Sequence, residues 1–176
     1  TGTGTFAPDN ITMGATYTPS PADTLAGSVT ITLTTTGNGL CNGATDIMVI
    51  TITEKPIVIA GINSVACKNN PDFPLSGSSS TGSGIWTTLG TGTFTPTATS
   101  LSATYVPGTA DTTAGSVILI LTSDNNGDCS VEDDSITITY IEEPIVNAGV
   151  DQTVCSNNPV VTLSGASNTG SGQWTT

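Results

Sequence analysis

Apolar and polar side chains alternate along several short stretches of this sequence. Residues 136–140 read Ile-Thr-Ile-Thr-Tyr, an alternation typical of a strand with one face in a core and the other in water. Residues 117–121 are almost all apolar and predict a central strand that is buried on both faces. Further short apolar stretches within 56–143 predict the remaining strands, the first of them broken; they are 57–59 with 64–66, 73–75, 85–87 and 101–105.

The residue types and the spacing of these strands favour one fold class. Thr, Val, Ile, Ser and Gly dominate, and β-branched side chains fit the pleated surface of a sheet better than they fit a helix. Six or seven short strands within 56–143 are typical of an Ig-like β-sandwich. We therefore predict an all-β chain. Its expected core consists of Leu75, Trp86, Phe94, Tyr105, Val117, Leu119, Leu121, Ile136 and Ile138.

The sequence repeats itself. Residues 2–6 (GTGTF) return as residues 90–94, an offset of 88 positions. The same offset carries Cys41 to Cys129 and Trp86 to Trp174 without a gap. The 176 residues therefore hold two periods of 88 residues, and the chain ends at the phase of the repeat at which it begins. We expect it to be a segment of a longer tandem array.

Two prolines give the expected domain boundaries. The triplets Glu54-Lys55-Pro56 and Glu142-Glu143-Pro144 each end a β-rich stretch at a proline, as linkers between β domains do. The predicted domains are 1–55, the C-terminal part of one repeat; 56–143, a complete repeat; and 144–176, the N-terminal part of the next.

The charged residues exclude several classes of function. The chain has 14 Asp and Glu, no His, and only Lys55 and Lys68 as cations, for a net charge of -12. Nucleic acids and anionic membranes bind clustered Lys and Arg, so neither is expected as a partner. Without His there is no Ser-His-Asp arrangement, and we predict no catalytic residues and no enzyme. No stretch approaches the roughly 20 apolar residues of a membrane-spanning helix, so membrane insertion is not expected.

Four cysteines, two in each period, are the disulfide candidates: Cys41, Cys67, Cys129 and Cys155. In a secreted array we expect them to be oxidised, and free buried thiols are the alternative. Cys41 with Cys67 would cross a domain boundary, and Cys67 with Cys129 would join opposite ends of an Ig-like sandwich, so both pairings are strained. A third pairing joins the first-turn cysteine of one domain to the last-hairpin cysteine of the next. The sequence leaves these pairings open.

An acidic loop offers the one weak candidate for a cofactor site. Asp124, Asp128 and Asp133 have the ligand type of a calcium loop. The counterpart in the other period, residues 36–40, contains no acid, although a stiffening metal would be expected in every period. We therefore expect a solvated turn here, and no metal or other cofactor.

The motifs of the whole chain resemble a known group of repeats. The stretch PIVNAGVDQTVC at 144–155 and the motifs GxWTT, GTGTF, ATYxP, AGSV and NGxC are similar to PKD-like and Ig-like repeats of giant cell-surface proteins of Bacteroidota. The group with the greatest resemblance is the repeat region of SprB-type gliding-motility adhesins. This resemblance implies tandem PKD-like or Ig-like sandwiches, export by the type IX secretion system, filament formation and an extracellular place at the cell surface.

The resemblance also implies a modification. Asp followed by Ser or Thr and then an aliphatic residue or Thr is a pattern of O-glycosylation in Bacteroidota, and it occurs at Thr24, Thr112 and Ser135. The alternative is a polar turn that the Asp caps.

Three functions fit these observations. The first is a structural repeat of an adhesin shaft or surface filament, whose partners are neighbouring repeats and a surface polysaccharide or substratum. The second is an array of carbohydrate-binding modules, which an exposed Trp86 would favour and a buried one would contradict. The third is a pilus-like polymer, in which residues 144–176 of one copy complete residues 1–55 of the next by strand addition.

Overall fold

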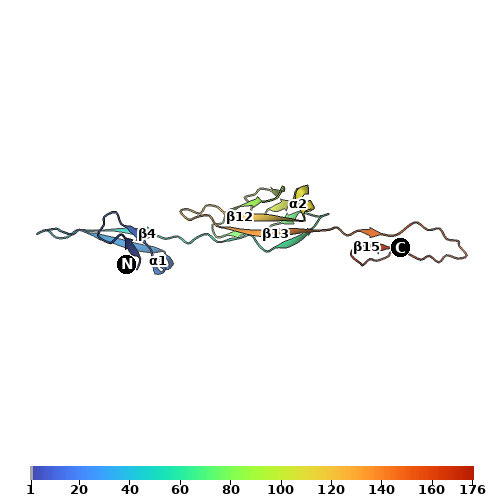
Figure 1. Cartoon of the computed structure of the whole chain (residues 1–176), viewed down its shortest axis with the longest axis horizontal. Coiled ribbons are helices and arrows are strands. Elements are labelled where there is room, and N and C mark those ends of the chain that lie inside the picture. The colour runs from blue at the N-terminus through green and yellow to red at the C-terminus, as the bar shows by residue number, and fades with distance from the viewer. Residues whose placement is uncertain (1) are drawn as a thin grey trace.

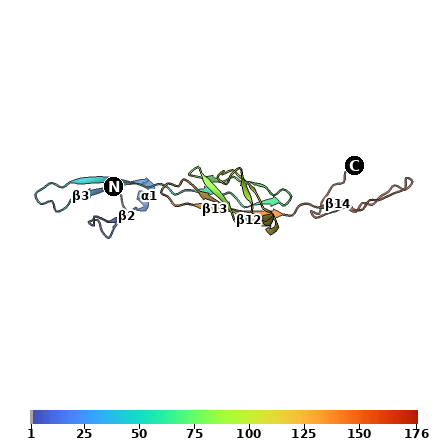
Figure 2. The ribbon, with the colours of Figure 1, turned by 90° about the horizontal axis from the view of Figure 1, so that it is seen from above.

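The computed structural model describes residues 2–176, and its elements fall into three groups that follow one another along an elongated chain (Figure 1). Strands β1–β4 and helix α1 precede the linker at Pro56, and β14–β15 follow the linker at Pro144. The group between them is the widest, and Figure 2 shows the same row from above. Thr1, the first residue of the predicted N-terminal domain, lies outside the described residues.

The largest sheet of the central group has four strands in the order β6-β13-β12-β9, which span Ser64–Cys67, Asp133–Ile141, Ser116–Ser123 and Gly84–Thr88. β12 is antiparallel to both of its neighbours, and β6 runs parallel to β13. The apolar stretch at 117–121 therefore lies in a strand with partners on both edges, as predicted.

Two smaller sheets complete the central group. β10, β11 and β7 form the first and span Thr93–Thr95, Thr104–Val106 and Phe73–Pro74. β5 and β8 form the second and span Val58–Ile59 and Ser78–Ser79. Side chains from all three sheets pack in one core, which lies against one face of β12 and β13. Burial alternates along both strands, so their other face is not covered.

This arrangement corrects two sequence-based expectations. β12 is buried on one face, since Val117, Leu119 and Leu121 are buried whereas Ile118 between them is 40% exposed. The reason is that no second layer covers the outer face of the sheet. The stretch predicted as a strand at 101–105 becomes one only at its end, because the Ala103 amide donates to Ser100 O in a turn.

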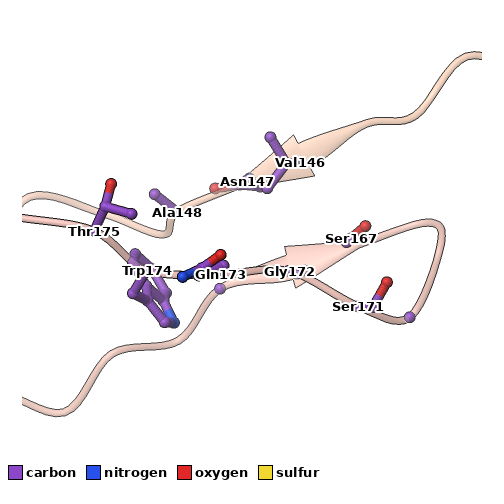
Figure 3. A pocket seen from close by; sticks show the side chains of 12 residues that line it. Val146, Asn147, Ala148, Ser167, Ser171, Gly172, Gln173, Trp174 and Thr175 are labelled. Carbon is purple, nitrogen blue, oxygen red and sulfur yellow. The ribbon is translucent and has the colours of Figure 1, made fainter.

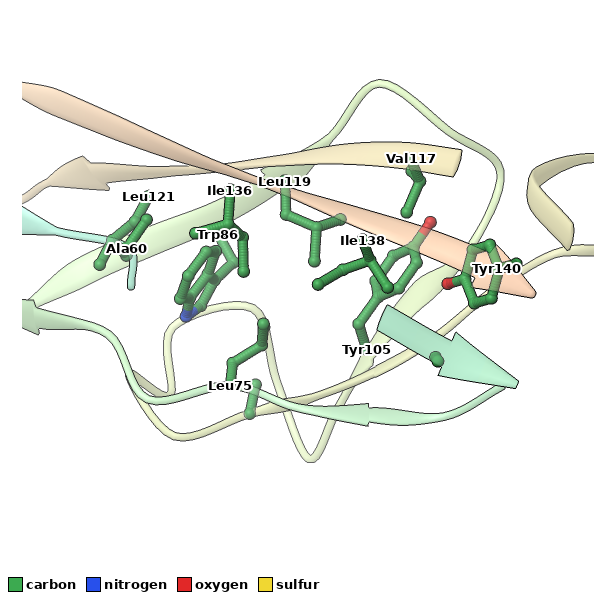
Figure 4. Packing of buried hydrophobic residues seen from close by; sticks show 12 residues of the cluster. Ala60, Leu75, Trp86, Tyr105, Val117, Leu119, Leu121, Ile136, Ile138 and Tyr140 are labelled. Carbon is green, nitrogen blue, oxygen red and sulfur yellow. The ribbon is translucent and has the colours of Figure 1, made fainter. Parts of the chain in front are cut away.

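The hydrophobic core lies between the sheets of the central group (Figure 4). Eight of the nine predicted core residues are buried, and the ninth, Phe94, is partly buried against Trp86 and Tyr105. The prediction omitted Ala60, Ala66, Ala103 and Tyr140, which are also buried. Burial raises the pKa of the Tyr140 phenol to about 12, and its buried hydroxyl oxygen has no hydrogen-bond partner among residues 2–176.

A short helix, α2 (Thr109–Ala114), follows β11 and was not predicted, because six residues are too few to show a helical period. It begins after Gly108, whose amide donates to Asp111 Oδ2 at 2.9 Å. It ends at Gly115, whose φ of 83° is the left-handed conformation that glycine adopts without strain.

The flanking groups contain the same kinds of element with fewer partners. The N-terminal group has two strand pairs and a helix, which are β1 (Thr5–Ala7) with β2 (Thr16–Thr18), β3 (Ser28–Thr34) with β4 (Thr45–Thr51), and α1 (Pro21–Ala26). The C-terminal group has one pair, β14 (Val146–Asn147) with β15 (Ala166–Ser167). Among residues 2–55 and 144–176, only Asp23 and Val29 are buried. Within residues 2–176, neither helix is long and apolar enough to cross a membrane.

Candidate functional site

The predicted glycosylation residues lie at the surface or close to it. Thr24 and Ser135 are exposed, in α1 and on the outer face of β13, and Thr112 is half-buried in α2. The hydroxyl groups of both threonines donate to backbone carbonyl groups of their own helix, Thr24 to Pro21 O and Thr112 to Thr109 O. O-Glycosylation at these three positions stays a prediction.

The aspartates that precede the two threonines have a structural role. Asp111 is buried, and its carboxylate accepts hydrogen bonds from Tyr105 Oη at 2.7 Å and from the Thr91 amide at 2.8 Å, besides the one from Gly108. Burial alone would raise the pKa of Asp111, but these hydrogen bonds outweigh it and hold the pKa below its ordinary value of 3.8. Asp23 has the equivalent bonds to Ser20, Thr3 and Tyr17, which hold its pKa well below the ordinary value. At these two positions the aspartate caps the start of its helix.

The acidic loop places its three candidate calcium ligands around the turn between β12 and β13. Asp124 and Asp128 lie in the loop and are exposed, and Asp133 is the first residue of β13. Among residues 2–176, no group of three or more His, Cys, Asp or Glu side chains is positioned to hold a metal ion. Hydrogen bonds to Ser83 from the Asn125 side chain and the Asp124 backbone hold the loop.

Trp86 is 1% exposed, and its indole Nε1 donates to Leu101 O at 3.3 Å. Its ring therefore presents no face on which a sugar could stack. Trp174 occupies the same position in the sequence repeat and is 54% exposed.

The exposed Trp174 borders an open groove of about 430 Å³ in the C-terminal group (Figure 3). Val146, Ala148 and Gly172 line the groove beside it. In the central group the corresponding space is filled by β12, because a Cβ added at Gly84 would lie 3.0 Å from Leu121 Cδ1. A Cβ added at Gly172, the counterpart of Gly84, would meet nothing within 4 Å. The groove therefore corresponds to the space that β12 fills in the central group, and no strand fills it among residues 144–176.

The N-terminal group has the opposite deficiency. Its β3–β4 pair corresponds to β12–β13, but within the described residues 2–55 it has no counterpart of β9 or β6 on either edge. Leu33 is 54% exposed and Met48 is 58% exposed, whereas their counterparts Leu121 and Ile136 are buried. The C-terminal groove thus lacks a strand pair of the β12–β13 type, and the N-terminal group exposes such a pair, β3–β4.

All four cysteines are free thiols in the described chain, and two of them lie where the linkers meet the central group. Cys129, in the β12–β13 loop, has its Sγ 3.4 Å from Glu54 O and 3.2 Å from Thr53 Oγ1 at the entry linker. Cys67, at the end of β6, has its Sγ 3.9 Å from Glu142 O at the exit linker.

These two cysteines cannot pair within the central group. Cys67 lies opposite Ile141, the last residue of β13, whereas Cys129 precedes the first. The nine residues of β13 place the two ends roughly 27 Å apart. A disulfide needs Cα atoms within about 7 Å.

Both lysines of the chain also lie at the ends of the central group. Lys55 Nζ is 3.3 Å from Glu132 Oε2 at the entry, and Lys68 Nζ is 2.6 Å from Glu142 Oε1 at the exit. Exposed pairs of this kind contribute about 0–1 kcal/mol each, so they orient the linkers more than they stabilise the fold. Sequence reasoning missed the linker contacts of Glu54 and Glu142, although the two glutamates stand 88 positions apart in the repeat.

No protein-family model matches this sequence, and no curated protein matches it.

Proposed function

We propose that this chain is a structural segment of a long extracellular filament or adhesin shaft, built from tandem Ig-like or PKD-like sandwich repeats of 88 residues. The observation that carries the proposal is that the chain enters the central group at one end and leaves it at the other (Figure 1). Repeats joined in this way lie in series, each in contact with its neighbours only, which is the arrangement of a load-bearing rod.

Corresponding local structure in the two periods supports the repeat. β1 pairs with β2 through Phe6 and Tyr17, and β10 pairs with β11 through Phe94 and Tyr105. The tyrosine hydroxyl donates to the capping aspartate six residues later in both periods. This correspondence of side chains and register supports the interpretation of the N-terminal group as the later part of a unit like the central one.

The proposal gives the chain a mechanical and adhesive role at the cell surface. The resemblance to SprB-type adhesin repeats supports this location, export by type IX secretion and a part in gliding motility. The net charge of -12 fits a solvated shaft that does not associate with other acidic surfaces.

A polymer of separate subunits is the second candidate, and the open groove at Trp174 favours it. The β3–β4 pair of another copy would supply Leu33 at the position that Leu121 occupies in the central group. A carbohydrate-binding array has less support, because Trp86 is buried and Trp174 is exposed only where the covering strand is missing.

The size of the native polypeptide separates these candidates. The cell-surface material is boiled in reductant and run on a denaturing gel, with an antibody to the central repeat as probe. One continuous shaft gives a band of several hundred kilodaltons. A band near 17.6 kDa would overturn the continuous shaft and establish separate subunits.

A further inference from the structure

We propose that neighbouring repeats are joined by a disulfide at every junction, between the first-turn cysteine of one repeat and the β12–β13-type hairpin cysteine of the next. This inference rests on the proposed tandem array. It assigns Cys67 and Cys129 to two different junctions, one at each end of the central group.

The two thiols contact backbone carbonyl oxygens that occupy the same position of successive repeats. Cys67 Sγ lies 3.9 Å from Glu142 O at the exit, and Cys129 Sγ lies 3.4 Å from Glu54 O at the entry. Glu54 and Glu142 are the same position of successive repeats. At a junction between two complete repeats, this single carbonyl therefore contacts the first-turn cysteine of the preceding repeat and the hairpin cysteine of the following one.

The shared contact limits how far apart the two sulfur atoms can be. They lie no further apart than the two distances added together, roughly 7 Å, whereas a disulfide bond is about 2 Å long. The two sulfur atoms would therefore have to approach by at most roughly 5 Å, which is a small movement for side chains on two surface turns. The alternative within one repeat would have to close roughly 27 Å along β13.

The local structure around the thiols is the same in both periods where it can be compared. The backbone of Cys67 forms an isolated antiparallel β-bridge with that of Asn70, and Cys155 forms the equivalent β-bridge with Asn158. Cys67 and Cys129, which face linkers, are half-buried, whereas Cys41 and Cys155 are exposed. In an array, Cys41 and Cys155 would each face a repeat that lies outside this chain.

The chemistry is a thiol–disulfide exchange. The two cysteine thiols lose two protons and two electrons and form one S–S bond, and an external disulfide such as oxidised glutathione takes them up to become two thiols. The product fixes the angle between neighbouring repeats, because it adds a second covalent connection beside the linker.

Two copies of the chain fused end to end, in phase with the repeat, test the inference. Residues 144–176 of the first copy and residues 1–55 of the second then make one complete repeat between two central ones. After oxidation with a glutathione buffer, alkylation and proteolysis without reductant, mass spectrometry should find two linked peptide pairs. The first joins Cys67 of the first copy to Cys41 of the second, and the other joins Cys155 of the first copy to Cys129 of the second.

A matched pair of variants identifies the copies. Cys67→Ser in the first copy should abolish the peptide that links Cys67 to Cys41 and leave the other link intact. Cys67→Ser in the second copy should change neither. If the Cys67–Cys41 link survives the first variant, it lies within one copy and the inference is wrong.

Fluorescence of Trp174 of the first copy, with the other tryptophans replaced by Phe, separates this inference from the proposed function. Linked peptides support the disulfide. Alkylated, unlinked cysteines with a blue-shifted, quencher-protected Trp174 would overturn the disulfide and leave the array intact. Unlinked cysteines with an exposed Trp174 would overturn both, because the middle repeat would not have formed.

Discussion

A single carboxylate ties three segments of the central group together. Asp111 in α2 accepts hydrogen bonds from Tyr105 in β11, from the amide before β10 at Thr91, and from Gly108 at the start of the helix. A buried charge is tolerated only when its oxygens are satisfied in this way. The cluster fixes the end of the core at which Tyr105 is completely buried.

We predict that Asp111→Asn lowers the free energy of unfolding by about 2–3 kcal/mol, because an amide nitrogen replaces one accepting oxygen and leaves donors unpaired. The change is measured by urea denaturation followed by far-UV circular dichroism. Asp128→Asn, in the exposed β12–β13 loop, is the control and should change stability by less than about 0.5 kcal/mol.

The same residue predicts a pH dependence. The pKa of Asp111 in the folded chain lies below its ordinary value of 3.8, so the stabilisation is complete above about pH 4 and is lost as the pH falls through the folded pKa. The Asp111→Asn variant should therefore lose less stability than the parent chain as the pH falls below about 4, because the variant has no carboxylate to protonate at this position. An unchanged acid slope would show that Asp111 is not ionised in the fold.

At the scale of elements, the sequence predicts best where side chains alternate over a long strand. β13 was predicted from the alternation that ends at Tyr140, and β12 from its apolar stretch. β8 and α2 were missed, because a two-residue strand and a six-residue helix carry no readable period. The one-sided burial of β12 also escaped prediction, since outward Ile118 and inward Leu119 are equally apolar and only the number of layers distinguishes them.

Close packing of β9 against β12 leads to the third prediction. Gly84→Ala should lower the free energy of unfolding by about 1–3 kcal/mol, because the new Cβ would lie 3.0 Å from both Leu121 Cδ1 and Thr122 O. Gly172→Ala is the matched control at the same repeat position, where nothing lies within 4 Å, and it should be without effect. Equal losses in the two variants, measured by urea denaturation, would mean that β9 does not pack on β12 as described.

At the scale of the molecule, the repeat could be recognised from the sequence, but the surfaces that it creates could not. The offset of 88 residues is visible in the positions of Trp86 and Trp174. That both residues are tryptophan does not indicate which of the two side chains is buried. Their difference in exposure, 1% against 54%, comes from whether a β12-type strand lies on them. For the same reason the cysteine pairings stayed open, because only the fold shows which linker carbonyl each thiol contacts.

The series arrangement makes a last prediction about length. The two ends of β13 lie roughly 27 Å apart and the linker adds about 10 Å, so each repeat should lengthen the rod by roughly 40 Å. The measurement is small-angle X-ray scattering of the single chain and of end-to-end fusions of two and three copies. Because each added copy contributes two periods, the maximum dimension should rise by roughly 80 Å per copy. Reduction of the proposed disulfides should then broaden the distance distribution without shortening the contour length of the rod, because the peptide linkers remain intact. A maximum dimension that stops growing with copy number would mean that neighbouring repeats fold back on one another, and a filament shaft could not be built from them.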